Sequence, residues 1–531
     1  MNTVSTELAR IVGKRVEMKK TAREVGHSNF QFVGEFLNQH GVIPYNTQLL
    51  RIFSLARKLR FQSVLVDEIS SDESPFLTEE NDALRNFGAN DFKFSHSQVF
   101  KFSFFGNGQN GDKDSLFLGY AIFKIDHFHD QKSFGHVFEA VLTPPRTIQE
   151  NSFLHCKRRY VVSNTEGTNF HVTGSLYAQQ NGKTFVCAHV ALRTALSHLL
   201  PEGDIRYSRI RTLAGSHQKL SPDQMERVFH SQGVALEFTK RCYEPFPRPC
   251  LTDQTPCKAA HLLDNKINYN KELYGLTESC VPAILGFNLA DGRRHVVPIL
   301  GHTFDEDSWV PSSNQCYFSQ NFRFFSSEQW LGSHLIHDDN FGPYFCLPRH
   351  FLEKSDFRIL YGINYDKSAF FASEAEATAL MFLHRAGKTL LKHGKCSPWS
   401  RLFIAFKDYL VLRAIYIDRA GYIQHLTSGP DSITQDGNDS AIVAKIEKVL
   451  PNKFWMIEAS TIELFPVTRR KFGEVILAPH DPEDTNTWNT SFIMMRLPGC
   501  YFFRNHDPDG KWIYEDSAFK EHSQVFSHPD I

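Results

Sequence analysis

The segment "QQNGKTFVCAHVALRTALSHLL", Gln179 to Leu200, joins a polar loop that contains a glycine to an apolar stretch. Apolar residues recur at helical spacing from Val190 to Leu199, and "NGKT" supplies turn residues ahead of them. The pattern predicts a helix that begins at or near Cys187. Unpaired backbone N–H groups and the positive end of the helix dipole favour a thiolate at that position. Cys187 is therefore the predicted nucleophile.

A thiolate nucleophile requires an imidazole that exchanges a proton with it. Downstream, the runs "VPAILGFNL" (281–289) and "HVVPILG" (295–301) predict two strands joined by a turn at Asp291 and Gly292. His295 begins the second of these strands. A histidine on a sheet strand that faces a cysteine at a helix start suits acyl transfer, so we predict that His295 is the general base.

The imidazole in turn needs a carboxylate or an amide that holds its orientation. Asp338 directly follows an apolar run in "SHLIHDDNFGPY" and precedes a turn that contains Gly342. Asp307, in "FDEDSWVP", is the alternative. We prefer Asp338, because a strand end followed by a glycine turn fixes a carboxylate better than a charged loop does.

The tetrahedral oxyanion of acyl transfer needs hydrogen-bond donors close to the sulfur. The backbone N–H of Cys187 is one predicted donor. The side-chain amide of Gln180, or that of Gln179, is the other, because an amide donates without a charge that would pair with the thiolate. None of these steps needs a cofactor or a metal ion.

This order of glutamine, cysteine helix, histidine strand and aspartate resembles the papain-like cysteine peptidases. Within that group, "VCAHVALRTAL" is similar to the nucleophile helix of the bacteriocin-leader-processing peptidases of certain export transporters. "HVVPILG" and "LIHDDNFGPY" are similar to their histidine and aspartate strands. The resemblance covers residues 160–350, about a third of the chain. The family places its glutamine six residues before the cysteine, whereas Gln180 precedes Cys187 by seven and Asn181 stands at the sixth position.

Composition excludes several classes of protein. The chain has 531 residues, 41% hydrophobic residues and a formal net charge of -1. A near-neutral balance argues against a nucleic-acid or anionic-lipid partner, which needs a basic field. No run approaches the roughly 20 apolar residues of a membrane helix, and the charged N-terminus lacks a signal-peptide core. We therefore expect a cytoplasmic protein with free thiols and no membrane insertion.

The length predicts two to three domains. We expect a helical and then β-rich domain over residues 1–159, a papain-like domain over 160–350 and an α+β domain over 351–531. The fold class is α+β, with the nucleophile helix packed on an antiparallel sheet and further α/β domains flanking it. In the first domain, helical spacing predicts helices over residues 6–25, 30–41 and 45–59. The segment "TFDEDSWVPSSNQCYFSQNFRFFSSEQWLGS" (303–333) is expected to loop out of the papain-like domain.

The predicted function is hydrolysis of a peptide or isopeptide bond in a peptide or protein substrate, with the flanking domains selecting the substrate or binding partner proteins. Two alternatives remain at this point: acyl transfer by an acyltransferase or transglutaminase-like enzyme that uses the same residues, and a non-catalytic protein that binds peptides. A zinc site is not expected, because no common ligand spacing relates Cys242, Cys250, Cys257 and His261.

Overall fold

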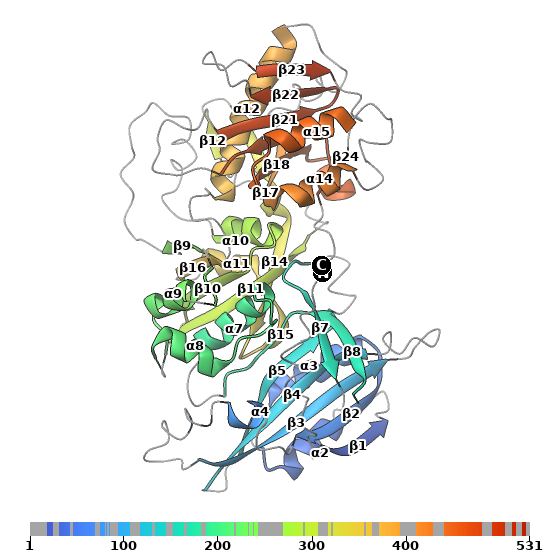
Figure 1. Ribbon diagram of the computed structural model, residues 1–531, viewed down its shortest axis with the longest axis vertical. Coiled ribbons are helices and arrows are strands. Elements are labelled where there is room, and N and C mark those ends of the chain that lie inside the picture. The colour runs from blue at the N-terminus through green and yellow to red at the C-terminus, as the bar shows by residue number, and fades with distance from the viewer. Residues whose placement is uncertain are drawn as a thin grey trace.

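The computed structural model arranges the chain as three main β-sheets that follow one another along the long axis of the molecule (Figure 1). Helices pack against each sheet. The structure describes residues 18–24, 31–42, 46–69, 75–79, 81, 84, 94–106, 117–129, 133–144, 152–163, 167–181, 187–216, 219–231, 233–236, 238–242, 269–289, 292–305, 317–319, 322–354, 357–363, 371–392, 410–427, 440–479, 491–504, 512–516 and 523–526.

The N-terminal sheet is antiparallel, and its strands lie in the order in which they occur in the sequence. Two helices, α2 (Gln31–Gln39) and α3 (Thr47–Lys58), supply its aromatic core, in which Phe36 and Phe53 pack edge-on against Phe102. The strands are β1 (Met18–Glu24), β2 (Phe61–Ile69), β3 (Phe94–Gly106), β4 (Phe117–Phe128) and β5 (Ser133–Leu142).

The sequence-based expectation for this domain is partly wrong. The predicted helices over 30–41 and 45–59 are confirmed as α2 and α3. The helix expected over 6–25 is contradicted at its end, because residues 18–24 form β1, paired from Met18 opposite Ile69 to Glu24 opposite Ser63. Pairing with a neighbouring strand overrides the weak local preference for a helix.

The central sheet is also antiparallel and has the order β15-β14-β11-β10-β16-β9, with β6 (Ser152–Leu154) paired to β11 off this path. Helix α7 (Cys187–Leu199) packs on β10 and β11, and α10 (Tyr269–Glu278) packs on the same two strands. The six strands in spatial order are β15 (Gly342–Pro348), β14 (Leu331–Asp338), β11 (Arg294–Phe304), β10 (Ala283–Asn288), β16 (Phe357–Ile363) and β9 (Phe238–Cys242).

The two helices lie on opposite faces of this sheet. Ile284 belongs to the same buried cluster as the apolar residues of α7. Its neighbours Ala283 and Leu285 belong to the cluster that contains residues of α10. Alternate residues of a strand point to opposite faces, so β10 separates the two helices. Two short helices, α8 (Tyr207–Ala214) and α9 (Pro222–His230), extend the core on the α7 side.

The C-terminal sheet has the order β12-β13-β17-β18-β20-β21-β22-β23. The long helix α12 (Ala372–Lys392) packs on β17, β18 and β20. Helices α14 (Arg419–Thr427) and α15 (Ser440–Val449) share a separate buried cluster with the same sheet. The strands in spatial order are β12 (Tyr317–Ser319), β13 (Phe322–Ser326), β17 (Leu410–Asp418), β18 (Lys453–Thr461), β20 (Gly473–Leu477), β21 (Phe492–Leu497), β22 (Cys500–Arg504) and β23 (Trp512–Asp516).

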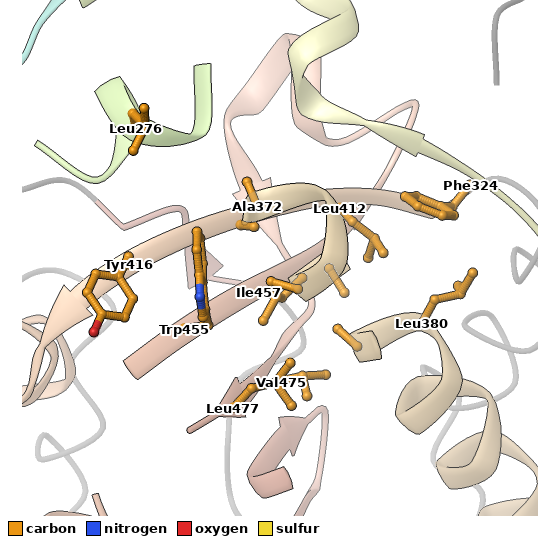
Figure 2. Close-up of a cluster of buried hydrophobic side chains, with 14 of the residues drawn as sticks. Leu276, Phe324, Ala372, Leu380, Leu412, Tyr416, Trp455, Ile457, Val475 and Leu477 are labelled. Carbon is orange, nitrogen blue, oxygen red and sulfur yellow. The ribbon is translucent and has the colours of Figure 1, made fainter. Parts of the chain in front are cut away.

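The sheets exchange strands across the expected domain boundary at residue 350. β16 lies beyond that boundary, yet it fills the position between β10 and β9 in the central sheet. β12 and β13 come from the segment expected to loop out, but they form one edge of the C-terminal sheet, where β13 runs parallel to β17. One buried cluster therefore continues from Leu276 on α10 to Trp455 in the C-terminal sheet (Figure 2).

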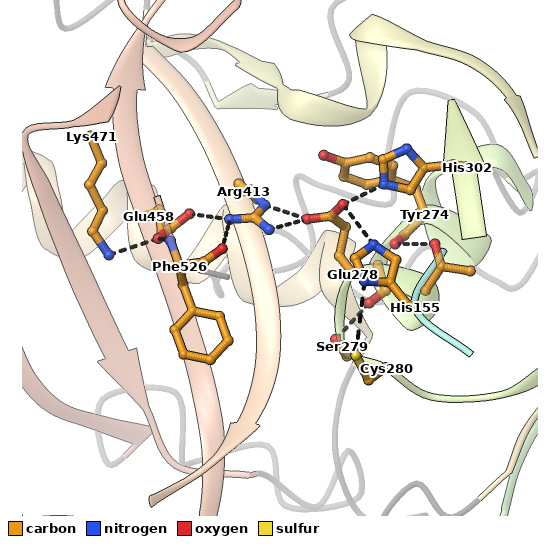
Figure 3. A network of polar contacts seen from close by, with 12 residues as sticks. His155, Tyr274, Glu278, Ser279, Cys280, His302, Arg413, Glu458, Lys471 and Phe526 are labelled. Carbon is orange, nitrogen blue, oxygen red and sulfur yellow. Dashed lines mark hydrogen bonds and ion pairs between the residues drawn. The ribbon is translucent and has the colours of Figure 1, made fainter. Parts of the chain in front are cut away.

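A series of side chains with alternating charge is buried where the central sheet and the C-terminal sheet meet (Figure 3). Arg413 on β17 pairs with Glu278 at the end of α10 and with Glu458, 2.7 Å away. Lys471 continues the series, since its Nζ lies 2.7 Å from Glu458 and 2.6 Å from Glu474. Burial opposes ionisation of Glu278, but Arg413 and hydrogen bonds from His155 and His302 hold its pKa well below the usual range.

Within the described residues, no helix combines the length and the apolar character that a membrane span requires.

Replacing Arg413 tests how strongly this series of charges joins the two sheets. Arg413→Met removes the cation and leaves two carboxylates buried without it, so we expect a loss of about 3–5 kcal/mol of unfolding free energy. Guanidinium titration followed by circular dichroism measures the loss. Arg57→Met, the same change at an exposed position of α3, is the control and should alter stability by less than about 0.5 kcal/mol. Equal effects of the two variants would contradict the assignment.

Candidate active site

Cys187 is the first residue of α7 and is partly exposed, whereas most of the helix behind it is buried. Leu192 and Leu196 in the middle of the helix are fully buried, and α7 packs on β11, so the apolar face anchors the helix to the central sheet. This anchoring leaves the N-terminal end of α7 beside the start of β11. There the Cys187 side chain is close enough to the ring of His295 to help raise the pKa of the imidazole.

The β10–β11 hairpin places His295. The backbone N–H of Leu289 donates to the carbonyl of Arg293 at 2.7 Å, and Gly292 takes a positive φ of 80° in the turn. The predicted turn between the two strands is confirmed at Gly292, whereas Asp291 lies outside the described residues. His295 then stands opposite Phe287, and their rings meet edge to face at 5.4 Å. The imidazole is 5% exposed, so its neighbours rather than water determine its orientation.

Asp338 reaches the same imidazole from the neighbouring strand. β11 and β14 run antiparallel with Ile299 opposite Ile336, which brings the turn after β14 level with the start of β11. The Nε2 atom of His295 lies 3.1 Å from Oδ2 of Asp338. The other oxygen, Oδ1, accepts the backbone N–H groups of Asn340 at 2.7 Å and Phe341 at 3.1 Å. With both oxygens engaged, the carboxylate has a fixed orientation.

Electrostatics favour a charged pair. Burial opposes the imidazolium, but the hydrogen bond with Asp338, the neighbouring Cys187 side chain and the charge of Asp339 outweigh it and raise the pKa of His295 to about 10. Burial likewise opposes ionisation of Asp338, but the bond with His295 and the two backbone donors lower its pKa. The ring is therefore protonated and the carboxylate ionised at neutral pH.

A second carboxylate, Asp339, also faces the ring and was not singled out from the sequence. Its Oδ1 lies 3.5 Å from His295 Nε2, and its side chain is 2% exposed. Burial is the main reason that the pKa of Asp339 is raised, to about 6, with Asp338 acting in the same direction against the attraction of His295. The only signal in the sequence is the pair of adjacent aspartates, which does not reveal that both would turn toward one imidazole.

The candidates for the oxyanion donor lie within residues 179–181. Gln179 is held by the N-terminal sheet, because its Oε1 accepts the backbone N–H of Val137 at 2.9 Å and the amide of Asn46 at 3.0 Å. Gln180 is partly buried, and Asn181 is 6% exposed. Asp307 lies outside the described residues, as do Cys250, Cys257 and His261. The role of Gln180 stays a prediction.

Two clusters among the described side chains bring three metal-ligand atoms within 4.8 Å of one another. In the first, His295 with Asp338 and Asp339, a cation would compete with the proton that the ring shares with the carboxylates. In the second, His155 and His302 with Glu278, the ion pair of Glu278 with Arg413 already balances the charge. A buried guanidinium beside this second cluster would repel a divalent ion, so the second cluster does not fit a resident metal.

No protein-family model, curated protein or solved structure matches this chain.

The pairing of His295 with Asp338 gives a direct test. In Asp338→Asn the ring loses its ionised partner, so the pKa of His295 should fall from about 10 by about one to three pH units. The pH titration of the ¹³Cε1 histidine signals measures it, with His295 assigned from the signal missing in His295→Gln. Asp305→Asn, at the exposed far end of β11, is the matched control and should leave the titration unchanged. A His295 pKa that is the same in Asp338→Asn as in the parent protein would refute the pairing.

Proposed function

We propose that this chain is a cysteine peptidase with a papain-like core that hydrolyses a peptide or isopeptide bond. The observation that carries the proposal is that one imidazole, His295, hydrogen-bonds with Asp338 and also lies beside the Cys187 side chain, which contributes to its raised pKa. The sulfur also lies at the first residue of a 13-residue helix, where backbone N–H groups have no partner within the helix. A thiolate, a proton carrier and an orienting carboxylate are the parts that cysteine acyl transfer needs.

In the proposed reaction, the proton of the Cys187 thiol already resides on His295, and Sγ of Cys187 attacks the carbonyl carbon, whose π electrons move to oxygen. The tetrahedral intermediate collapses when the imidazolium gives its proton to the leaving amine, and a thioester remains. His295 then takes a proton from water, and the hydroxide adds to the thioester. The second intermediate expels the thiolate as the carboxylic acid product leaves.

The distribution of charge supports this sequence of steps. Asp338 and Asp339 both face Nε2 of His295, so Nδ1 is the ring nitrogen left for the sulfur. A ring pKa of about 10 keeps a proton on His295 near neutral pH, so the imidazolium can give that proton to the leaving amine. Asp338 does not take the proton, because its own pKa is lowered. It holds the ring in one orientation and one protonation pattern.

The oxyanion would accept the backbone N–H of Cys187 and the side-chain amide of Gln180. Helix α7 directs its first N–H groups toward the side on which the sulfur lies, and preorganised donors of this kind stabilise developing charge without reorganisation. The location of Gln180 on the segment that leads to Cys187 is compatible with this role.

The two alternatives differ in what they require. Acyl transfer to an amine uses the same steps up to the thioester, so the products formed in the presence of an amine decide between transfer and hydrolysis. A non-catalytic peptide-binding protein does not need the contact between Cys187 and His295, and the partly exposed sulfur beside a charged imidazole favours an enzyme. The proposal includes a cytoplasmic location, which agrees with the free thiols at Cys156, Cys187, Cys280, Cys346 and Cys500.

Alkylation tests the proposal directly. At pH 7, iodoacetamide should modify Cys187 at least about tenfold faster than any other thiol, because the adjacent imidazolium favours the thiolate. Peptide mass spectrometry over a time course measures the rates. Cys346 is the internal control, since it is exposed but burial of its surroundings raises the pKa of its thiol. Cys187→Ala should abolish hydrolysis of peptide substrates, whereas Cys346→Ala should not. A Cys187 that reacts no faster than Cys346 would rule the proposal out.

A further inference from the structure

Helix α3 of the N-terminal domain touches both halves of the candidate active site through its first turn. Asn46 is the N-cap of α3, and Gln48 is the second residue of the helix. Both side chains are 7% exposed although they are polar. Buried polar side chains are retained where they have partners, and here the partners lie on two segments that are far away in the sequence.

The first half is the segment that leads to Cys187. Residues 177–179 run along the edge strand β5, where Tyr177 and Ala140 exchange two backbone hydrogen bonds of 2.8 Å. The side chain of Asn46 closes this arrangement, because its amide donates to Gln179 Oε1 at 3.0 Å and to the carbonyl of Gly135 at 2.8 Å. The chain thus approaches the nucleophile from a position that the N-terminal domain determines.

The second half is the turn after Asp338. The Gln48 amide donates to the backbone carbonyl of Asn340. Asn340 is also the residue whose N–H holds Asp338 Oδ1 at 2.7 Å. Gly342 takes a positive φ of 100°, and a Cβ there would lie 2.8 Å from Cγ of Arg51, so the turn lies directly against α3. Arg51 itself donates to the carbonyl of Tyr344 at 3.2 Å.

We propose that α3 is part of the active site and that Asn46 and Gln48 are its positioning residues. Gln48 fixes the position of Asn340, and the N–H of Asn340 orients Asp338 and through it the His295 ring. Asn46 fixes the position of Gln179, which precedes the predicted oxyanion donor Gln180. This inference rests on the proposed function, because it takes Cys187 and His295 as the reacting groups. It also gives the N-terminal domain a role that the resemblance, confined to residues 160–350, does not provide.

A small displacement is enough for a large effect. A net hydrogen bond contributes about 1 kcal/mol, which is too little to decide whether a chain of this size folds but enough to select one position of a turn. A misplacement of about 1 Å in a catalytic group can cost about a hundredfold in rate. The two links should therefore affect chemistry more than stability.

Two variants test the Gln48–Asn340 and Asn46–Gln179 hydrogen bonds separately. Gln48→Met keeps the length of the side chain and removes its amide. Asn46→Ser keeps an oxygen that can cap Leu49 N–H but is too short to reach Gln179. Gln39→Met, an exposed glutamine on α2, is the matched control. Each full-length variant is examined by ¹³Cε1 histidine titration, by hydrogen exchange of the peptides that contain residues 175–181 and 338–342, and by hydrolysis of p-nitrophenyl acetate.

Gln48→Met should lower the pKa of His295, speed exchange at Asn340 and Phe341, and reduce kcat about 10- to 100-fold with little change in KM. Asn46→Ser should speed exchange over residues 175–181 and reduce kcat without moving the His295 titration. Gln39→Met should match the parent protein. If both variants only lower the melting temperature and leave the titration, local exchange and kcat unchanged, α3 is merely structural and the inference fails.

The failure of the proposed function has a different signature. In that case Cys187 of the parent protein would not be unusually reactive and p-nitrophenyl acetate turnover would survive Cys187→Ala. The histidine titration and the exchange measurements need neither turnover nor a reactive thiol. They would still decide whether α3 positions the His295–Asp338 pair.

Discussion

The hydrogen bond between His295 and Asp338 depends on the way two strands of the central sheet pair, and the candidate site depends on that bond. The β10–β11 hairpin determines the position of the imidazole, and the turn after β14 determines the position of the carboxylate. Helix α7 brings the sulfur to the same place because its apolar face is buried on the same sheet. The buried ring and the buried carboxylate stabilise each other's charge.

Buried charges are also stabilised by opposite charges at the other end of the central sheet. Glu278, Arg413, Glu458 and Lys471 are buried as an alternating series, and each charge is tolerated because the next one opposes it (Figure 3). Apolar packing continues past this series from α10 into the C-terminal sheet (Figure 2). Of these two buried charge clusters, one lies beside the partly exposed Cys187 and the other lies between the central and C-terminal sheets.

The sequence predicts those features of the site that depend on contacts between residues close together in the chain. The apolar spacing after Cys187 and the turn residues before His295 predict a helix start and a hairpin that the structure contains. Contacts between distant segments leave no comparable signal. Nothing near Gln48 indicates that it meets Asn340, and nothing in the segment of β12 and β13 indicates which sheet it joins. The strand β1 was mistaken for a helix for the same reason, since its conformation follows from pairing with β2.

The exchange of strands between sheets has a consequence for biosynthesis. The central sheet cannot be completed until β16, ending at Ile363, has left the ribosome, and the C-terminal sheet waits for β23 although β12 and β13 emerge much earlier. Domains normally fold one after another as they are translated. Here β12 and β13 are synthesised well before the strands that they pair with. The thiol of Cys187 therefore leaves the ribosome long before the central sheet is complete and His295 and Asp338 can assemble beside it.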